Sequence, residues 1–526
     1  MRYPLAVAVL APVVALIAAL AVLPAQAATA DPPAERRSAP LTASVPLADD
    51  SAEQTLERAA RALSGDARRE RPTDAPSGER VEATLILRDL ALALPDLRGE
   101  DRRAARALLA RPTDGAADPL GNGYTTASVK KCAPKICLHW VKRTADAPPG
   151  TGWANRSLAM MQKVYRFEVG KLGYRPPVRD PGVGGNSKFD VYLKDIGAGV
   201  YGYCVPEYRV QGTTSVASGY CVLDNDFKPA QFNGAPARRS LMVTAAHEFF
   251  HAIQFGYDYR EDPWLLESTS TWMEERFADS ADDNRQYLPF GTVRLPASSL
   301  DLFSQGALNH YGNWAFWEYL SQRYGNGVVQ QVWNRSADFK GAPNQYSVRA
   351  LESVLKSRGG LTKVFAAYSA ANTLPSRAYP EGKKWPRAAL LARFRHGTQA
   401  KRASFAAAVD HLASQSIRLT PDESLKSRKW LVRININGPG RSAAPAAYLT
   451  IVKQNGGLVR RAVPLTRQGA GRTRIGFSAS SVRTVTITLV NASTRYRCRT
   501  GQPFACGGAP QDQDRTFRVN TAVVKR

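Results

Sequence analysis

The sequence predicts a mixed α+β domain followed by an antiparallel, sandwich-like β domain, and three observations support this fold class. Strand-like segments lie between residues 137 and 227, and a long apolar helix follows them directly. Helical patterns then continue to about residue 410. From residue 411 onward, alternating apolar segments recur at intervals of roughly ten to twenty residues with Gly, Pro and Asn between them, as in a sandwich or barrel.

The length of the chain sets its domain organisation. Its 526 residues exceed what one hydrophobic core holds, and a hydrophobic content of 44% indicates folded domains. We expect four parts, which are a signal peptide over 1–27, a helical segment over 28–124, the mixed domain over 125–410 and a basic β domain over 411–526.

Residues 1–27 have the pattern of a secretory signal peptide. Arg2 precedes a long apolar run, which ends in the small residues Ala25 and Ala27 around Gln26. An uncleaved membrane anchor is the alternative, but Pro12 and the small-residue ending favour cleavage after Ala27. We therefore expect a secreted, extracellular protein that has no membrane contact after cleavage.

The segment over 28–124 is rich in Ala, Arg and Pro and contains two helical patterns, at 51–63 and 84–97. Its position between a signal peptide and the mixed domain leaves two interpretations open. One is a pro-segment that is removed, and the other is a structural extension that stays attached.

The six cysteines fall into three pairs that are close in sequence. In an exported chain, close pairs are typical of local disulfides, and none is left over. A zinc knot is less favoured, because CAPKIC has four intervening residues and no second such pair. The expected disulfides are Cys132 with Cys137, Cys204 with Cys221, and Cys498 with Cys506.

The charge of the chain is concentrated at its C-terminus. The formal net charge is +26, and residues 418–526 contain 20 basic residues against four acidic ones. No nucleic-acid recognition motif is visible, so we expect anionic cell-surface polymers or acidic substrates as partners, and no nucleic acid. The alternative is that the basic surface only keeps the protein soluble.

The segment LMVTAAHEFFHAIQFGYD, residues 241–258, carries the clearest chemical signal. His247 and His251 lie four residues apart, so one helix face presents both imidazoles to a single metal ion, with Glu248 beside the open position. This spacing predicts a Zn²⁺ site, which needs a third ligand. We expect Gly256 to end this helix and a second helix over 264–279, WLLESTSTWMEERFAD, to pack against it.

The segments HEFFHAIQ and WLLESTSTWMEE resemble the gluzincin metallopeptidases, in particular exported bacterial zinc metalloproteases with HEFFHxxQ and WLxEGTATWxE motifs. The resemblance covers residues 130–340. It implies that His247, His251 and Glu267 bind Zn²⁺ and that Glu248 is the general base. Glu274, seven residues after Glu267, would support the site from behind.

Two features of the second helix qualify this assignment. Glu274 or Glu275 is the alternative third ligand, because Glu267 follows His251 more closely than in many gluzincins. Ser268 and Ser270 stand where the family has Gly and Ala, and we expect these small side chains to be accommodated.

The resemblance implies a secreted enzyme that uses zinc to hydrolyse peptide bonds in protein or peptide substrates. We expect it to be a monomer. The oxyanion would need a donor, for which His310 or Tyr311 in NHYGNW is the candidate; the alternative is that both are buried polar residues with local partners. His139, His396 and His411 are interpreted as surface or core histidines.

We expect SGYCVLD, residues 218–224, to be an edge strand beside the metal that pairs with an extended peptide. The GxMEN motif of zinc aminopeptidases is absent, which favours an endopeptidase.

The alternative function is a non-enzymatic surface protein whose basic C-terminal domain binds anionic cell-wall polymers. Glu248 argues against it, since a structural metal site needs no base.

Overall fold

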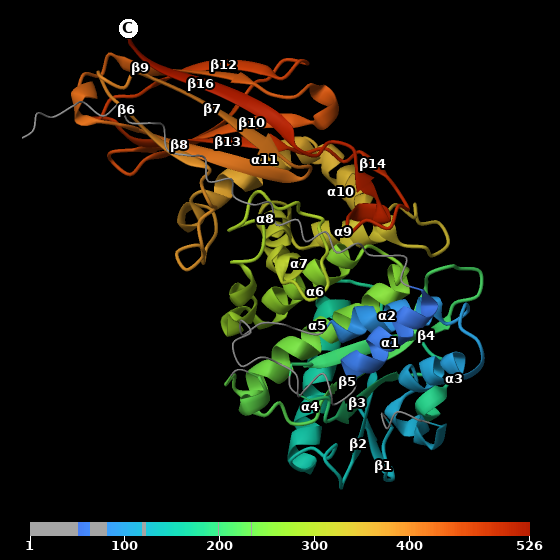
Figure 1. Cartoon of the computed structure of the whole chain (residues 1–526). Coiled ribbons are helices and arrows are strands. Elements are labelled where there is room, and N and C mark those ends of the chain that lie inside the picture. The colour runs from blue at the N-terminus through green and yellow to red at the C-terminus, as the bar shows by residue number, and fades with distance from the viewer. Residues whose placement is uncertain (1–50, 64–81, 118–122, 198, 233) are drawn as a thin grey trace, which may run out of the picture. The chain divides into compact units, whose positions relative to one another are not determined.

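The computed structural model describes residues 51–63, 82–117, 123–197, 199–232 and 234–526 (Figure 1). The predicted signal peptide lies outside these residues. The described chain has an N-terminal helical part, a mixed α/β part and a C-terminal β-rich part. The predicted order of a mixed region followed by an antiparallel β-rich region is therefore confirmed.

The mixed part is built on a five-stranded sheet in the order β1-β2-β3-β5-β4. The strands β2, β3 and β5 are parallel, and β1 and β4 are antiparallel at the two edges. Their bounds are β1 (Ser128–Cys132), β2 (Ile136–Val141), β3 (Phe189–Lys194), β4 (Gly202–Arg209) and β5 (Ala217–Asp224). The prediction that SGYCVLD forms an edge strand is wrong. It lies in β5, which is buried along its whole length between two neighbours, and β4 forms the edge.

Helices cover both faces of this sheet. On one face, side chains such as Val191 and Leu223 pack against α4 (Thr151–Tyr165) and α5 (Ala237–Asp258). On the other face, Tyr192 and Tyr220 pack against the N-terminal helices. These are α1 (Ala52–Leu63), α2 (Ala83–Ala93) and α3 (Gly99–Leu108). The N-terminal helical segment is thus a layer of the mixed part in this structure.

The helix α5 is longer than predicted. Gly256 lies inside it, and the helix continues to Asp258. Every residue from Leu241 to Asp258 except Met242 is buried, so packing on all sides outweighs the intrinsic cost of one glycine in a helix. The expectation that Gly256 ends the helix is therefore wrong.

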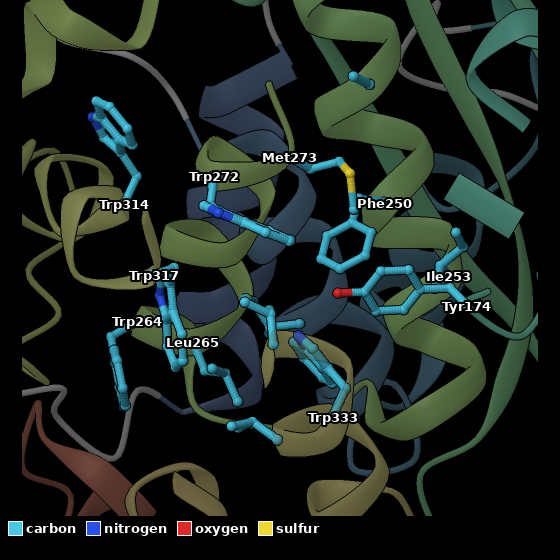
Figure 2. Close-up of a cluster of buried hydrophobic side chains, with 14 of the residues drawn as sticks. Tyr174, Phe250, Ile253, Trp264, Leu265, Trp272, Met273, Trp314, Trp317 and Trp333 are labelled. Atoms are coloured by element: carbon cyan, nitrogen blue, oxygen red, sulfur yellow. The ribbon is translucent and has the colours of Figure 1, made fainter. Parts of the chain in front are cut away.

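The second half of the mixed part is helical and packs around buried tryptophans (Figure 2). Trp264 on α6 stacks on Trp317 of α8 with ring centroids 5.9 Å apart, and Trp333 of α9 packs beside Phe250 of α5. Trp333 Nε1 also donates to the Thr269 hydroxyl of α6 at 3.2 Å, so α9 contacts both α5 and α6. The helices are α6 (Pro263–Ala278), α7 (Asn309–Gly312), α8 (Trp314–Tyr324), α9 (Gly327–Ser336), α10 (Ser347–Leu355) and α11 (Leu361–Asn372).

The C-terminal part consists of two sheets that enclose one apolar core, in the orders β11-β10-β13-β8-β6 and β12-β9-β16-β7. All strand pairs are antiparallel except β6 with β8. The strands are β6 (Ala392–His396), β7 (Arg402–Val409), β8 (Ala413–Pro421), β9 (Trp430–Asn437), β10 (Pro445–Lys453), β11 (Leu458–Val463), β12 (Ala470–Gly476), β13 (Val482–Asn491) and β16 (Arg515–Lys525), with a small pair β14 (Tyr496–Arg497) and β15 (Ala509–Pro510).

The C-terminal sheets begin at Ala392, before residue 411. The alanine-rich segment in β7 favours a helix by its intrinsic preference, but it pairs with β16 over eight residues. Non-local pairing therefore decides the structure of residues 392–409.

The three predicted disulfides are present, and the described residues contain no free cysteine. Cys204–Cys221 and Cys132–Cys137 each join residues that face each other on paired strands. None of the described helices combines the length and the apolar character that crossing a bilayer requires.

Three histidines outside the HEFFH motif are core residues with partners. His139 Nε2 lies 2.8 Å from Asp190 Oδ1, and His411 Nε2 lies 2.8 Å from Asp301 Oδ1. The Nε2 atom of His396 lies 2.9 Å from the Thr521 hydroxyl. All three side chains are buried, so of the two interpretations, surface or core, the structure supports core histidines.

Candidate metal centre

The side chains of His247, His251 and Glu267 converge at the contact of α5 and α6. Their ligand atoms all lie within 4.8 Å of one another, and all three residues are buried. The two Nε2 atoms are 3.1 Å apart, and the Glu267 carboxylate oxygens lie 3.2 Å from that of His247 and 3.6 Å from that of His251. A tetrahedral zinc ion with bonds of about 2.0–2.1 Å separates its ligand atoms by about 3.3 Å, so the three residues fit such an ion.

The hydrogen bonds of the two imidazoles show which nitrogen faces the cluster as an acceptor. His247 Nδ1 lies 2.7 Å from Glu274 Oε1, and His251 Nδ1 lies 2.7 Å from Gln254 Oε1. Both partners are acceptors, so each Nδ1 carries a proton and each Nε2 presents a lone pair. Two lone pairs and the Glu267 carboxylate then point at one another, an arrangement that requires a cation.

The pKa values of His247 and Glu267 also indicate that the cluster needs a positive charge. Burial opposes the charged form of His247, but hydrogen bonds to Glu267 and Glu274 outweigh it and raise the pKa of His247 to about 10. Burial also opposes ionisation of Glu267, but the two imidazoles hold the pKa of its carboxyl well below the usual range. Without a metal the site retains a proton, which an incoming metal ion displaces.

Gln254 fixes the orientation of His251. Its Nε2 atom donates to Leu266 O, at 3.0 Å, and to the hydroxyls of Thr269 and Ser270, each at 3.1 Å. The amide oxygen must therefore face His251. One side chain of α5 thus connects a ligand to the backbone and to two hydroxyls of α6.

Both serines that replace the family's Gly and Ala are accommodated. Ser268 donates to Trp264 O and accepts from Trp317 Nε1 at 2.8 Å, while Ser270 accepts from Gln254.

The alternative ligands lie elsewhere. Glu274 contacts His247 from behind, and Glu275 instead accepts a hydrogen bond from Asn284.

Glu248 stands beside the cluster but is engaged by the N-terminal segment. Its Oε2 atom accepts a hydrogen bond of 2.9 Å from the hydroxyl of Thr84, at the start of α2. The same hydroxyl accepts the backbone N–H of Cys204, on the edge strand β4, at 2.9 Å. A side chain at Gly202 would crowd Glu248, since a Cβ there would lie only 2.9 Å from Glu248 Cγ.

The cavity over the cluster is small. It has a volume of about 30 Å³, enough for one or two water molecules and far below the several hundred Å³ of typical ligand pockets. Residues of the N-terminal segment form part of its wall. It is lined by Glu82, Ala83, Thr84, Gly199, Tyr201, Gly202, His247, Glu248, His251, Glu267 and Tyr311.

The two candidate oxyanion donors occupy different positions. Tyr311 lines the cavity, and its ring lies 6.1 Å from that of His247. His310 is buried, and its Nε2 atom lies 2.7 Å from Glu82 Oε1. His310 therefore has a local partner from the N-terminal segment, and Tyr311 is the one of the two that reaches the cavity.

Sequence reasoning missed Glu82, Thr84 and the role of Gln254. The glutamine ends the HEFFHAIQ motif, so its fixed spacing from His251 was an available signal. Glu82 and Thr84 lie in a segment whose pattern indicates only an amphipathic helix. Their place at the site depends on how α2 packs on β4, which no local pattern encodes.

Comparison with known proteins leaves the function open. Residues 208–352 match the model of a Family of unknown function (DUF6055), and this stretch contains β5, α5 and α6. No curated protein matches the chain.

One solved structure to which the chain is similar is a family GH115 4-O-methyl-alpha-glucuronidase with specificity for decorated arabinogalactans. The identity is 8% and the TM-score 0.14, with 68% of this chain covered. The match spans 54% of the length of that enzyme. At this TM-score the likeness says nothing about the fold or activity of the present chain.

The contact between His247 and Glu274 leads to a prediction about metal affinity. Glu274→Gln preserves the shape of the side chain but replaces a carboxylate by a neutral amide behind the ligand. We expect zinc affinity, measured by competition with a chromophoric chelator, to fall about 10- to 100-fold. The matched variant Glu275→Gln, one residue further along α6, should leave zinc affinity unchanged; an equal loss in both variants would contradict the role of Glu274.

Proposed function

We propose that this protein is an exported zinc metallopeptidase that hydrolyses internal peptide bonds. The observation that carries the proposal is the convergence of three lone-pair ligands, His247 and His251 of α5 and Glu267 of α6, with Glu248 beside the histidines on α5. A structural metal site has no use for an additional carboxylate at its open side. The resemblance of HEFFHAIQ and WLLESTSTWMEE to gluzincin motifs supports the same chemistry.

Each residue of the cluster has a part in this proposal. His247, His251 and Glu267 would hold the ion, with Glu274 and Gln254 maintaining the tautomers of the histidines. A zinc ion in this position supplies a Lewis acid that lowers the pKa of water and polarises a carbonyl oxygen. Glu248 Oε2 accepts the proton of the attacking water and then delivers it to the nitrogen of the leaving amine. Tyr311 is the side chain placed to donate to the developing oxyanion.

The edge strand β4 supports binding of an extended substrate. Its outer side is not paired with another strand, and the N–H of Cys204 points to the position that Thr84 occupies. A peptide that added to β4 would find this N–H as a hydrogen-bond donor next to Glu248. Recognition by the main chain favours unfolded or loop segments and cleavage within a chain.

The N-terminal segment must move before such a peptide can enter. The Thr84 hydroxyl donates to Glu248 Oε2 and accepts the N–H of Cys204, and the remaining cavity holds only one or two water molecules. We therefore propose that the described form is closed and that displacement of residues 82–97 opens it. Both a removed pro-segment and a hinged extension are compatible with this step.

Export is supported by two independent features. The N-terminal sequence has the pattern of a cleaved signal, and three disulfides are formed between described residues. Disulfides of this kind persist in oxidising compartments, which are extracellular for an exported chain.

The function is tested by metal-dependent hydrolysis of an unfolded protein. A reduced and alkylated protein substrate is incubated with the purified chain before and after release of the N-terminal segment by limited proteolysis, and new termini are identified by mass spectrometry. We expect cleavage by the zinc-loaded, opened protein, loss of cleavage after chelation, and recovery with one equivalent of zinc. Absence of cleavage by an opened protein that holds one equivalent of zinc would refute the peptidase proposal.

A further inference from the structure

The sheet β12-β9-β16-β7 has one face toward the sandwich core and one exposed face. Inward side chains such as Ile434 and Val519 are buried, while the alternate positions on the same strands are exposed or half-buried. Five of the outward positions are arginines. We call this surface the arginine face, and its members are Arg402, Arg433, Arg472, Arg474 and Arg518.

The strand register places the outward side chains in three rows that cross all four strands. Neighbouring rows are about 7 Å apart along a strand, and neighbouring side chains in a row are about 5 Å apart. The rows are Arg474, Arg433, Ala522 and Arg402; then Arg472, Asn435, Asn520 and Ser404; then Ala470, Asn437, Arg518 and Ala406.

The positive charge of this face has no counterpart on the face itself. None of the four strands contains Asp or Glu, and Arg474 lies directly opposite Arg433. Like charges in directly opposed positions destabilise a sheet. In the described chain beyond residue 411, the arginines that form ion pairs are Arg495 and Arg515, both with Asp512, and neither belongs to the arginine face. An anion from outside the chain would relieve this repulsion.

The outward face of the other sheet carries fewer arginines, with Arg393 and Arg395 of β6 beside Arg418 of β8, and its central strands are covered. Its outward side chains, among them Ala446, Tyr448 and Val490, pack against the helical core of the mixed part, where α11 contacts β10 and β13 (Figure 1). The arginine face is therefore the more exposed broad face of the sandwich, and the residues between its arginines are small or polar.

We propose that the arginine face binds a linear anionic glycopolymer whose repeating units carry phosphate or carboxylate groups. Guanidinium groups bind both anions in a bidentate manner, and the face offers five of them within three neighbouring rows. Asn435, Asn437 and Asn520 lie between the arginines and offer donors and acceptors for hydroxyl groups. Apolar side chains are few on this face, with Leu431 and Val524 half-buried at one end, and this disfavours a folded protein as the partner.

This inference is independent of the proposed peptidase activity, because no residue of the arginine face belongs to the metal centre. It assigns a location to the excess of basic residues in the C-terminal part. Attachment to an anionic polymer at the cell surface would also hold the metal centre near proteins embedded in that polymer.

The test measures binding of the full chain to two fluorescent polymers, polygalacturonate for carboxylate and poly(glycerol phosphate) for phosphate, and to duplex DNA for comparison, at several salt concentrations. The test variant replaces the five arginines of the arginine face by Gln. The control variant removes the same charge from exposed positions elsewhere, with Gln at Arg106, Lys142, Arg143, Arg335 and Lys340. Thermal unfolding of both variants verifies that each remains folded.

We expect binding of at least one polymer, a loss of at least about tenfold in the arginine-face variant, and a change of less than about twofold in the control. The polymer that binds more tightly identifies phosphate or carboxylate as the preferred group. Equal losses in the two variants would show diffuse attraction by net charge and overturn the proposal. No binding of either polymer, or tighter and equally face-dependent binding of duplex DNA, would overturn it as well.

Discussion

The Glu248→Gln variant is expected to hydrolyse an unfolded protein about 10²- to 10⁴-fold more slowly than the unmodified chain while it retains one equivalent of zinc. The amide has the shape of the carboxylate but cannot accept the proton of the attacking water. His247, His251 and Glu267 remain in place, so metal binding should be unaffected. The measurement is kcat for the opened, zinc-loaded protein, with zinc content determined on the same sample.

The matched control for this variant is Glu275→Gln. Glu275 is also buried, and burial raises the pKa of its carboxyl to about 8, so the neutral amide resembles the form present at pH 7. Its rate should stay within about twofold of the unmodified chain. A Glu248→Gln variant that keeps full activity with zinc bound would exclude Glu248 as the base.

The Thr84→Val variant of the full chain is expected to hydrolyse the same substrate faster. Valine has the shape of threonine but loses the hydrogen bonds to Glu248 Oε2 and to the N–H of Cys204. In the variant, the Glu248 carboxylate and the Cys204 N–H lack a hydrogen-bond partner only in the closed form. When α2 is displaced, water or substrate can reach both groups. At about 1 kcal/mol for each buried hydrogen bond, the open population should increase about 30-fold.

Two measurements separate opening from a general loss of stability. Thr373→Val removes a comparable buried hydroxyl from the end of α11 and should lower the thermal midpoint without raising the rate. Hydrogen exchange of residues 83–93 should accelerate in Thr84→Val and not in Thr373→Val. If Thr84→Val is slower than the unmodified chain, then Thr84 is part of the working site and the described form is not closed.

The two predictions distinguish the chemistry from its control by the N-terminal segment. Glu248→Gln should remain slow whether or not α2 is displaced, whereas Thr84→Val should lose its advantage once the segment has been released. Burial raises the pKa of Glu82, and His310 beside it has the opposite effect, so this buried pair also belongs to the contact that opening would break. The contacts of Glu82 and Thr84 therefore identify the start of α2 as the region to examine for activation of the enzyme.

Local patterns in the sequence were sufficient for much of the fold and for the cluster. The spacing of His247 and His251 places both on one helix face whatever surrounds it, and the second helix begins within one residue of its predicted start. The three disulfides follow from cysteines that are close in sequence. In each case the interacting groups lie within one element or in neighbouring elements, so short-range rules apply.

Other features depended on contacts between distant segments. The pairing of β4 with β5 makes β4 the edge strand instead of SGYCVLD. The helix α5 continues past Gly256 because the surrounding residues are buried. The alanine-rich β7 is a strand because β16 lies beside it. Intrinsic preferences are worth less than about 1 kcal/mol per residue, and tertiary packing exceeds that amount at these positions.

The sequence by itself determined which residues can form a zinc site, because two histidines one helical turn apart and a glutamate on the next helix are a local arrangement. Only the tertiary structure decided that the site is covered. Thr84 reaches Glu248 across 164 positions of the chain, and a contact of that range arises from the packing of α2 on β4 and leaves no periodic signal in either segment. For the same reason, the basic composition of the C-terminal part was visible in the sequence, whereas the strand register alone placed five of its arginines on one exposed face.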